Sequence, residues 1–191
     1  MSTQTRKERE RAQRQQQIVD TARELAEAEG WDAVTIRKLA ERIEYSQPVL
    51  YSHFANKAAI VGAVALQGCV ELAEEIRLAR ESATTRTEVF DRVARAYLDF
   101  ATANPARYDA IFVLTTDLNF GLDAPQPLRA AFAGLEAMFS AGAEGDELGA
   151  RTEVAWAGLH GLATLERSDR LRPELRERRI ALLVESWAAF G

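Results

Sequence analysis

The sequence predicts an all-α protein, in which an N-terminal three-helix domain is joined through a long fourth helix to a second helical domain. Apolar residues recur at helical spacing along nearly the whole chain, and no alternating strand pattern of convincing length occurs. No proline lies between Pro48 and Pro105, which leaves room for long helices. The chain has no Gly/Ser-rich linker and no internal repeat. We therefore expect two domains, residues 1–60 and 61–191, that meet at the fourth helix.

The first helix is expected over roughly residues 8–29. One face of it carries the apolar residues Ile18, Ala22, Leu25 and Ala26. Gly30 is placed to adopt the left-handed conformation just after the helix, so that Trp31 packs back on its last turn. Thr35 is then the expected cap of a second helix, whose stripe is Ile36, Leu39, Ala40 and Ile43.

A short third helix follows, with Ser46 as its expected cap. Gln47 and Pro48 lie in its first turn, where the missing N–H of proline costs little. Leu50 and Phe54 are four positions apart and are expected to face inward. Only two apolar anchors therefore hold this helix.

The fourth helix is expected to start near Asn56 and to run to about Glu81. A long irregular loop is expected over residues 115–127. The later helices are predicted at about residues 86–103, 105–115, 126–141, 146–168 and 173–189.

Composition excludes several classes of protein. The charged N-terminus lacks the apolar stretch of a signal peptide, and no apolar run is long enough to span a bilayer. We therefore expect a cytoplasmic protein without a membrane partner. Cys69 is the single cysteine and cannot form an internal disulfide. The two histidines lie more than a hundred positions apart, so no zinc site is expected, and the sequence predicts no metal or other cofactor.

The net charge of −5 is unevenly distributed. Residues 1–61 hold ten Lys/Arg against nine Asp/Glu, and the remainder holds 14 against 20. The first 16 residues alone carry five Lys/Arg against two Glu. A less acidic first third is compatible with nucleic-acid binding there, although a charged tail is usually just solvated.

Two short helices joined by about three residues, the second polar outside, form a helix-turn-helix pattern. The outward residues of the third helix gather at its N-terminus, the end that reaches base edges in such motifs: Gln47, Pro48, Val49, Tyr51 and Ser52. Glutamine pairs with adenine, and proline and valine contact thymine methyls. The alternative is a small three-helix bundle with a polar outer face.

Four residues are placed for other contacts with DNA, one of them the Tyr51 already named. Arg37 projects from the second helix and is suited to pair with guanine. Thr35, Tyr51 and Lys57 sit at helix ends, where phosphate contacts fix register.

The segment "AVTIRKLAERIEYSQPVLYSHFANKAAIVGAV" resembles the TetR (tetracycline-repressor) family of bacterial regulators. It shares the threonine at the start of the second helix, "LA", the pattern "LY.HF" and the "NK" that opens a long helix. The resemblance implies that Arg37, Gln47, Pro48 and Val49 read bases and that Thr35, Tyr51 and Lys57 contact phosphates. His53 matches a family histidine and is expected either to pack or to contact phosphate. The expected DNA-binding residues are thus Thr35, Arg37, Ser46, Gln47, Pro48, Val49, Tyr51, His53 and Lys57.

The turn departs from this family in two positions. Glu44 stands where the family often has glycine, in a conformation that commonly has positive φ and costs a non-glycine residue roughly 1 kcal/mol. Tyr45 replaces a small aliphatic residue and is expected to pack inward or to reach a phosphate.

Downstream, "AYLDFATANPARYDAIF" and "AWAGLHGLATLE" resemble the regulatory domain of a TetR subgroup with a recurring Trp…His-Gly signature. Aromatic residues in these helices are candidates to line a ligand cavity, which is usually apolar with a few polar groups. The alternative is that they are ordinary core, and that the histidine among them is a hydrogen-bonded core residue. The candidate ligand-binding residues are Tyr97, Phe100, Tyr108, Phe112, Phe120, Trp156 and His160.

Two late helices are candidates for self-association. Small residues in the helix at 146–168 allow close approach of another backbone, and the last helix carries an apolar stripe. Either stripe could instead face its own core. The resemblance implies an isologous four-helix dimer interface, with two recognition helices set for a palindromic operator. The candidate interface residues are Gly158, Gly161, Leu162, Leu165, Ile180, Leu183, Val184 and Trp187.

These expectations combine into a ligand-responsive repressor of transcription, with a double-stranded DNA operator, an unidentified small-molecule effector and a second copy of the chain as partners. A helical enzyme is not expected, because no catalytic triad, phosphate loop or metal spacing occurs. The competing hypothesis is a helical ligand- or protein-interaction module without sequence-specific DNA binding, favoured by Glu44 and the acidic balance.

Overall fold

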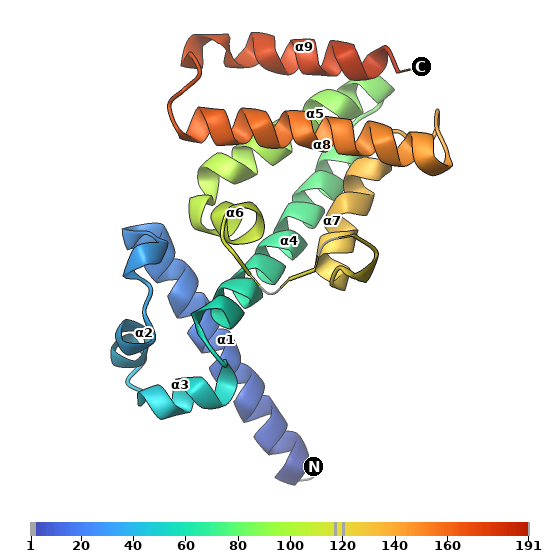
Figure 1. Cartoon of the computed structure of the whole chain (residues 1–191). Helices are drawn as coiled ribbons and strands as arrows, with labels where there is room; N and C mark the ends of the chain where they lie inside the picture. The colour runs from blue at the N-terminus through green and yellow to red at the C-terminus, as the bar shows by residue number, and fades with distance from the viewer. Residues whose placement is uncertain (1–2, 117, 120, 191) are drawn as a thin grey trace. The chain divides into compact units, whose positions relative to one another are not determined.

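The computed structural model describes residues 3–116, 118–119 and 121–190, except the side chains of residues 3–5 and 122. Within these residues every regular element is a helix, which confirms the all-α prediction (Figure 1). None of the described helices is both long and apolar enough to cross a membrane.

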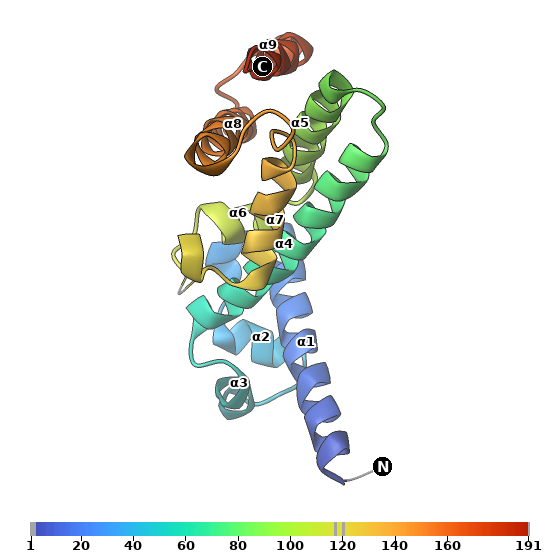
Figure 2. The ribbon, with the colours of Figure 1, turned by 90° about the vertical axis from the view of Figure 1, so that its right-hand side faces the viewer.

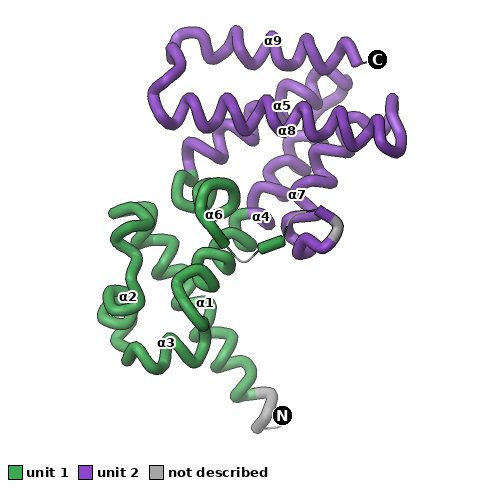
Figure 3. The backbone as a smooth tube through the Cα atoms, in the orientation of Figure 1, with its two compact units in different colours: residues 1–68, 104–119 green, residues 69–103, 120–191 purple. Residues whose placement is uncertain are grey.

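The described chain divides into two compact units (Figure 3). Unit 1 comprises residues 1–68 and 104–119, and unit 2 comprises residues 69–103 and 120–191. Helix α4 (Lys57–Glu81) contributes its first half to unit 1 and its second half to unit 2. The boundary between the two compact units therefore lies after residue 68 and not after residue 60 as predicted. Residues 104–119, which are distant in sequence, also belong to unit 1.

Unit 1 is built on α1, which is flanked by two short helices and by the start of α4. Its elements are α1 (Thr3–Glu29), η1 (Trp31–Ala33), α2 (Ile36–Arg42), α3 (Gln47–His53), the first half of α4, and α6 (Pro105–Phe112). The core joins Ile18 and Leu25 of α1 to Leu39, Leu50 and Ile60 of the next three helices, all of which are fully buried. Burying these side chains holds the short α2 and α3, which are too short to be stable alone.

The end of α1 follows the sequence prediction. Gly30 has a φ of 81°, in the left-handed region that glycine adopts without strain. Its N–H donates to the Ala26 carbonyl at 2.8 Å, and Trp31 is 8% exposed. The chain therefore turns back at Gly30 and packs the indole into the unit.

Helix α6 is joined to the rest of unit 1 by two hydrogen bonds on Ala106 and by a close approach to α4. The Trp31 indole Nε1 donates to the Ala106 carbonyl at 2.9 Å in a buried position. The Ala106 N–H donates to Oε2 of Glu27 at 3.2 Å. This N–H lies in the first turn of α6 and has no partner within the helix, so a carboxylate of α1 caps α6. A Cβ at Gly68 would lie 3.0 Å from Cδ1 of Ile111, so α4 and α6 also approach closely.

Unit 2 holds the second half of α4 together with four further helices. They are α5 (Arg86–Ala103), α7 (Gln126–Glu136), α8 (Gly145–Arg167) and α9 (Arg176–Ala188). Helices α8 and α9 each pack against α5 (Figure 2). The aromatic centre consists of Phe90, Phe139 and Trp187, whose ring centroids lie 5.4 to 6.3 Å apart. Trp187 meets both phenylalanine rings edge-to-face, and such contacts add to the apolar burial.

This core corrects part of the predicted dimer interface. Ile180, Val184 and Trp187 are 0%, 6% and 1% exposed and lie inside unit 2. Their stripe on α9 therefore faces the chain's own core, where Trp187 completes the aromatic centre. Leu183, between them in sequence, is only half-buried.

Four helix ends differ from the predictions. Helix α1 begins at Thr3 rather than near residue 8. Helices α6 and α7 end early, at Phe112 and Glu136. After Glu136 the chain continues in tighter turns, in which the Met138 and Phe139 N–H groups bond three residues back. The last helix begins at Arg176, after the 3₁₀ turn η3 (Pro173–Leu175). Periodicity continues through such turns, so it does not mark the change of helix type.

Candidate nucleic-acid interface

Helix α2 begins at a conventional cap. Thr35 has extended backbone angles, and its Oγ1 accepts a hydrogen bond from the Lys38 N–H at 3.1 Å. Leu39 and Ala40 are buried, which fixes the inner face of α2. Thr35 itself remains exposed. The predicted cap is therefore confirmed, and the proposed phosphate contact of Thr35 stays a prediction.

The turn between α2 and α3 has the conformation expected from the family comparison. Glu44 has a φ of 58°, in the left-handed region. The Tyr45 N–H donates to the Ala40 carbonyl at 2.9 Å, which closes a Schellman-type end on α2. The turn is thus made without glycine. Tyr45 is half-buried, and its hydroxyl donates to Oε1 of Gln17 on α1 at 3.1 Å.

Helix α3 is held by few side chains. Leu50 is fully buried, Phe54 is half-buried, and the Phe54 N–H donates to the Leu50 carbonyl at 2.9 Å. Ser46 stands at the N-cap position, but its side chain makes no capping hydrogen bond, contrary to the sequence prediction. The Ser46 hydroxyl therefore does not cap the helix. Pro48 lies in the first turn, where its lack of an N–H leaves no donor unsatisfied.

The outer face of α3 is open to solvent within unit 1. Gln47 and Pro48 are exposed, Tyr51 is 54% exposed, and Val49 is half-buried. Gln47, Pro48 and Tyr51 are therefore left uncovered by the rest of the chain, and Val49 is covered only in part. The first turn of α3 therefore presents an amide and two apolar side chains, which can contact base edges in a major groove, and the Tyr51 phenol follows in the next turn.

Arg37 carries its own counter-ion. Its Nε donates to Oε1 of Glu41 at 2.8 Å, and this hydrogen bond raises the pKa of Arg37. Both side chains are largely exposed. An exposed i,i+4 pair is weak, so a guanine edge or a phosphate can replace the carboxylate.

Lys57 has an internal acceptor. Its Nζ donates to the Trp31 carbonyl at 2.6 Å, which ties the start of α4 to η1. The ammonium has three donors, so this bond leaves donors for a phosphate. The phosphate role of Lys57 stays a prediction.

His53 lies at the C-terminal end of α3. Its Nδ1 is shielded from solvent and has no hydrogen-bond partner among the described residues. Burial lowers the pKa of His53, and the nearby positive charges of Arg11 and Arg14 lower it further. The imidazole is therefore neutral near pH 7, which favours packing over a cationic phosphate contact.

The predicted ligand-binding aromatics are divided between the two units. Unit 1 holds Tyr108 and Phe112, whose ring centroids lie 4.9 Å apart. Phe120 lies outside the described residues. The other predicted residues in unit 2 are Tyr97, Phe100, Trp156 and His160. The six described candidates are therefore not gathered within one compact unit.

A polar contact links two of the candidates in unit 2. The Trp156 Nε1 donates to the Tyr97 hydroxyl at 3.2 Å. Phe132 of α7 meets the Trp156 ring edge-to-face at 6.4 Å. The sequence analysis did not single out Phe132, because no motif marks it. Burial lowers the pKa of His160, one turn after Trp156, so its imidazole is neutral near pH 7.

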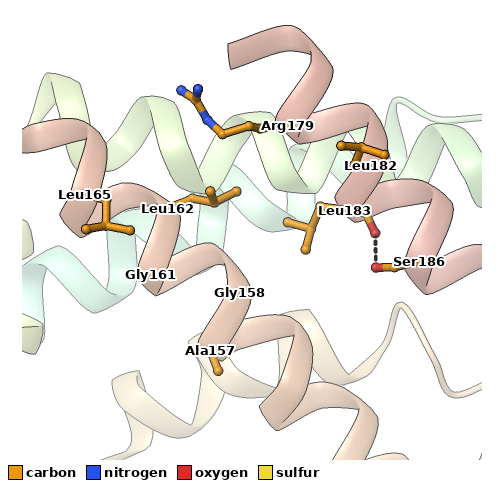
Figure 4. Close-up of a pocket in the computed structure, with 9 residues that line it drawn as sticks. All are labelled: Ala157, Gly158, Gly161, Leu162, Leu165, Arg179, Leu182, Leu183 and Ser186. Atoms are coloured by element: carbon orange, nitrogen blue, oxygen red, sulfur yellow. Dashed lines mark hydrogen bonds between the residues drawn. The ribbon is translucent and has the colours of Figure 1, made fainter. Parts of the chain in front are cut away.

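An open groove runs between α8 and α9 (Figure 4). Leu165 and Leu182 in it are 37% and 49% exposed. Gly158 lies close to Leu183, whereas a Cβ at Gly161 would meet nothing within 4 Å. The groove is lined by Ala157, Gly158, Gly161, Leu162, Leu165, Arg179, Leu182, Leu183 and Ser186.

Five of the predicted dimer residues line this groove, and on its α9 side the prediction named only Leu183. Arg179, Leu182, Leu183 and Ser186 recur at helical spacing, so the pattern was present in the sequence. This set is less apolar than the stripe of Ile180, Val184 and Trp187, so hydrophobic periodicity alone does not single it out.

The described residues contain no group of three or more His, Cys, Asp or Glu side chains that could hold a metal ion. Cys69 is buried, and burial raises the pKa of its thiol to about 12. A thiol in this environment stays protonated and unreactive.

Two family models match the chain. Residues 18–64 match the model for bacterial regulatory proteins of the tetR family. Residues 90–186, about half of the chain, match the model for a tetracyclin repressor-like C-terminal domain.

Several characterised and uncharacterised regulators are similar in sequence. YobS of Bacillus subtilis, an uncharacterized HTH-type transcriptional regulator, is 32% identical over 105 residues, or 54% of this chain and 53% of that protein. The chain thus spans about half the length of this relative. Rv0681 of Mycobacterium tuberculosis, of the same description, is 28% identical over 78% of this chain and 68% of its own. A class G tetracycline repressor protein of Vibrio anguillarum is 45% identical over 25% of this chain and 22% of its own.

Solved structures share the fold. A protein of unknown function from Rhodococcus sp. RHA1 superposes with a TM-score of 0.69 at 22% identity, covering 92% of each chain. A TetR variant from Acinetobacter baumannii AYE in complex with minocycline superposes with a TM-score of 0.63 at 21% identity, covering 91% of each chain.

Proposed function

Because the chain belongs to the TetR family of bacterial transcriptional regulators, we propose that it is a repressor that binds a palindromic DNA operator as a homodimer and leaves it when a small molecule binds. Members of this family are DNA-binding regulators and not enzymes, and repression and ligand binding are typical of them. The membership of this chain in the Trp…His-Gly subgroup remains a prediction.

One observation carries the proposal of DNA reading: the first turn of α3 is open. Gln47, Pro48 and Tyr51 are exposed although α3 is anchored by the fully buried Leu50. A helix that served only to complete a three-helix bundle would not need these side chains to remain uncovered at one end. In this geometry Gln47 is suited to adenine, and Pro48 and Val49 to thymine methyls.

The dimer is proposed to form at the α8–α9 groove. An isologous contact needs a self-complementary surface, and small residues on α8 beside exposed leucines on α9 supply one. The glycines allow a partner helix to approach, and Leu162, Leu165 and Leu182 supply apolar area. A dimer through this groove would present two copies of α3 to two half-sites.

The effector is proposed to bind beside the aromatic residues of unit 2. The Tyr97 hydroxyl and the neutral His160 imidazole offer polar groups within largely apolar surroundings, as small-molecule sites require. The Acinetobacter relative binds minocycline, but the tetracycline repressor match covers only a quarter of this chain. Tetracyclines are therefore a first probe and not the proposed effector. Helix α4, which extends from unit 1 into unit 2, is the proposed carrier of the change.

The experiment is a mobility-shift titration on the promoter region beside the protein's own gene, with a scrambled duplex as competitor. We expect a specific shift that weakens steeply with salt, since phosphate contacts release counterions. The double variant Gln47→Ala/Tyr51→Ala should lose the specific shift.

The chain contains a matched control. Gln126 is also an exposed glutamine that precedes a proline in the first turn of a helix, but it lies on α7 in unit 2. Gln126→Ala should bind the operator as the wild type does. If the Gln47/Tyr51 variant kept the full specific shift, the competing hypothesis of an interaction module without sequence-specific DNA binding would replace the proposal.

A further inference from the structure

Helix α1 continues well beyond the body of unit 1. Its buried residues begin at Ile18, whereas the side chains from residue 6 to residue 17 are all exposed or half-exposed. In Figures 1 and 2 the helix runs on past α3 towards the N-terminus. Residues 6–17, called the α1 extension below, therefore form a helical segment whose side chains remain largely open to solvent.

One side of the α1 extension is cationic. Lys7, Arg11 and Arg14 precede Ile18 at spacings of four, three and four positions, which places them on the helix face that Ile18, Ala22 and Leu25 occupy further on. That face packs against the unit's core from residue 18 onwards. The stripe that is apolar in the core thus becomes basic where the helix leaves the core.

The basic stripe lies next to α3. Tyr45, which precedes α3, donates to Gln17 on the α1 extension at 3.1 Å. At the other end of α3, the charges of Arg11 and Arg14 help to lower the pKa of His53. Neither guanidinium makes an ion pair among the described residues, whereas Arg6, on another side of the helix, pairs with Glu10 at 2.8 Å.

We propose that the α1 extension is a second DNA-contact element, in which Arg11 and Arg14 bind backbone phosphates beside the bases that α3 reads. The inference rests on the proposed function, because it needs a duplex seated on α3. Like charges placed side by side with no protein counter-ion disfavour one another, and a phosphate strand relieves that repulsion. Arginine suits this role because its planar group can bind a phosphate through two N–H donors.

The test compares two double variants in operator titrations at several salt concentrations. Arg11→Gln/Arg14→Gln removes the charges that face α3, and Arg6→Gln/Arg9→Gln removes two charges from other sides of the same segment. All four side chains are exposed, so both variants should unfold as the wild type does in a thermal melt. Losing two phosphate contacts should reduce the slope of log K against log salt by about 1.8 for each bound protomer. The Arg6/Arg9 variant should lose less than half of that.

A second comparison shortens the DNA. If the α1 extension contacts the flanks of the half-site, trimming these flanks should lower the operator affinity of the wild type. The wild type and the Arg11/Arg14 variant should then bind the shortened operator equally well. Equal loss of slope in both double variants, or no loss in either, would overturn the inference while leaving specific binding by α3 intact. A wild type that did not distinguish the operator from a scrambled duplex would instead overturn the proposed function, and the inference with it.

Discussion

At Glu44 a single residue holds an unfavourable backbone conformation in the turn between α2 and α3. Its φ of 58° places the carbonyl of a non-glycine residue close to its own Cβ. The conformation persists because the Tyr45 N–H bonds to the Ala40 carbonyl and Leu50 anchors the helix that follows. The turn is thus determined by the packing around it and not by its own residue preference.

Replacing Glu44 by glycine should therefore stabilise the protein. Removing Cβ relieves roughly 1 kcal/mol of left-handed strain, part of which is offset because glycine gains freedom in the unfolded chain. We expect the free energy of unfolding in urea to rise by about 0.5 kcal/mol.

Asp169 provides the comparison, since it is the other described non-glycine residue with positive φ, at 53°. Aspartate tolerates this region better than glutamate does, so Asp169→Gly should raise the free energy of unfolding less than Glu44→Gly does, or not at all. A loss of stability in Glu44→Gly would show that the Glu44 side chain contributes more than its backbone costs.

At the scale of elements, α6 is held by two polar contacts that reach it from α1 and η1. Glu27 caps the Ala106 N–H, and Trp31 donates to the Ala106 carbonyl. Because α6 follows α5 in the chain, it provides a covalent link from unit 2 back into the unit that carries α3. The indole N–H of Trp31 thus fixes a segment that is distant in sequence.

Trp31→Phe keeps an aromatic ring and removes this donor. Losing the buried hydrogen bond and some packing should lower the free energy of unfolding by about 1–3 kcal/mol. It should also speed amide hydrogen exchange in α6, measured by mass spectrometry on peptides covering Pro105–Phe112. Trp156→Phe makes the same chemical change in unit 2 and should leave exchange in α6 unaltered. If exchange in α6 were equally slow in Trp31→Phe, the docking of α6 would depend on other contacts, such as those at Gly68.

The sequence predicted elements whose signals are local. Helix α5 begins and ends as predicted, at Arg86 and Ala103, because Pro105 and the polar residues before Arg86 limit its periodic pattern. The open first turn of α3 was also predictable, since Gln47, Pro48 and Tyr51 do not suit a core. The helix-turn-helix required only the spacing of two short stripes.

Tertiary partners could not be predicted in the same way. An apolar stripe shows that a helix face is buried but not what covers it, and for Ile180, Val184 and Trp187 the cover is the chain's own core. Likewise, nothing in residues 105–112 indicates that Trp31 binds them. The aromatic candidates for the effector site share composition and yet belong to different units.

At the scale of the whole molecule, the open side of α8 and α9 is the surface that we propose for a second copy of the chain. Ile180, Val184 and Trp187 of α9 are buried in the chain's own core, so the proposed partner would pack on the groove residues instead. A stable interface of ordinary size buries about 800 Å² on each partner. If two α8 helices approach closely at their glycines, the α8–α9 pairs of the two subunits can bury an area of this size.

Gly161→Gln tests this assembly, because a Cβ at Gly161 meets nothing within 4 Å of its own chain. The longer side chain should leave the subunit folded and raise its helix stability slightly, by less than about 1 kcal/mol, while blocking a partner backbone. We expect light scattering after size exclusion to give a monomer where the wild type gives a dimer, and operator affinity to fall at least tenfold as the two half-sites are bound independently. Gly149→Gln adds the same side chain to α8 at a second position with open space, outside the groove, and should remain dimeric. If Gly161→Gln remained dimeric and Gly149→Gln did not, the interface would lie at the other end of α8. If both variants remained dimeric, neither position would lie in the interface.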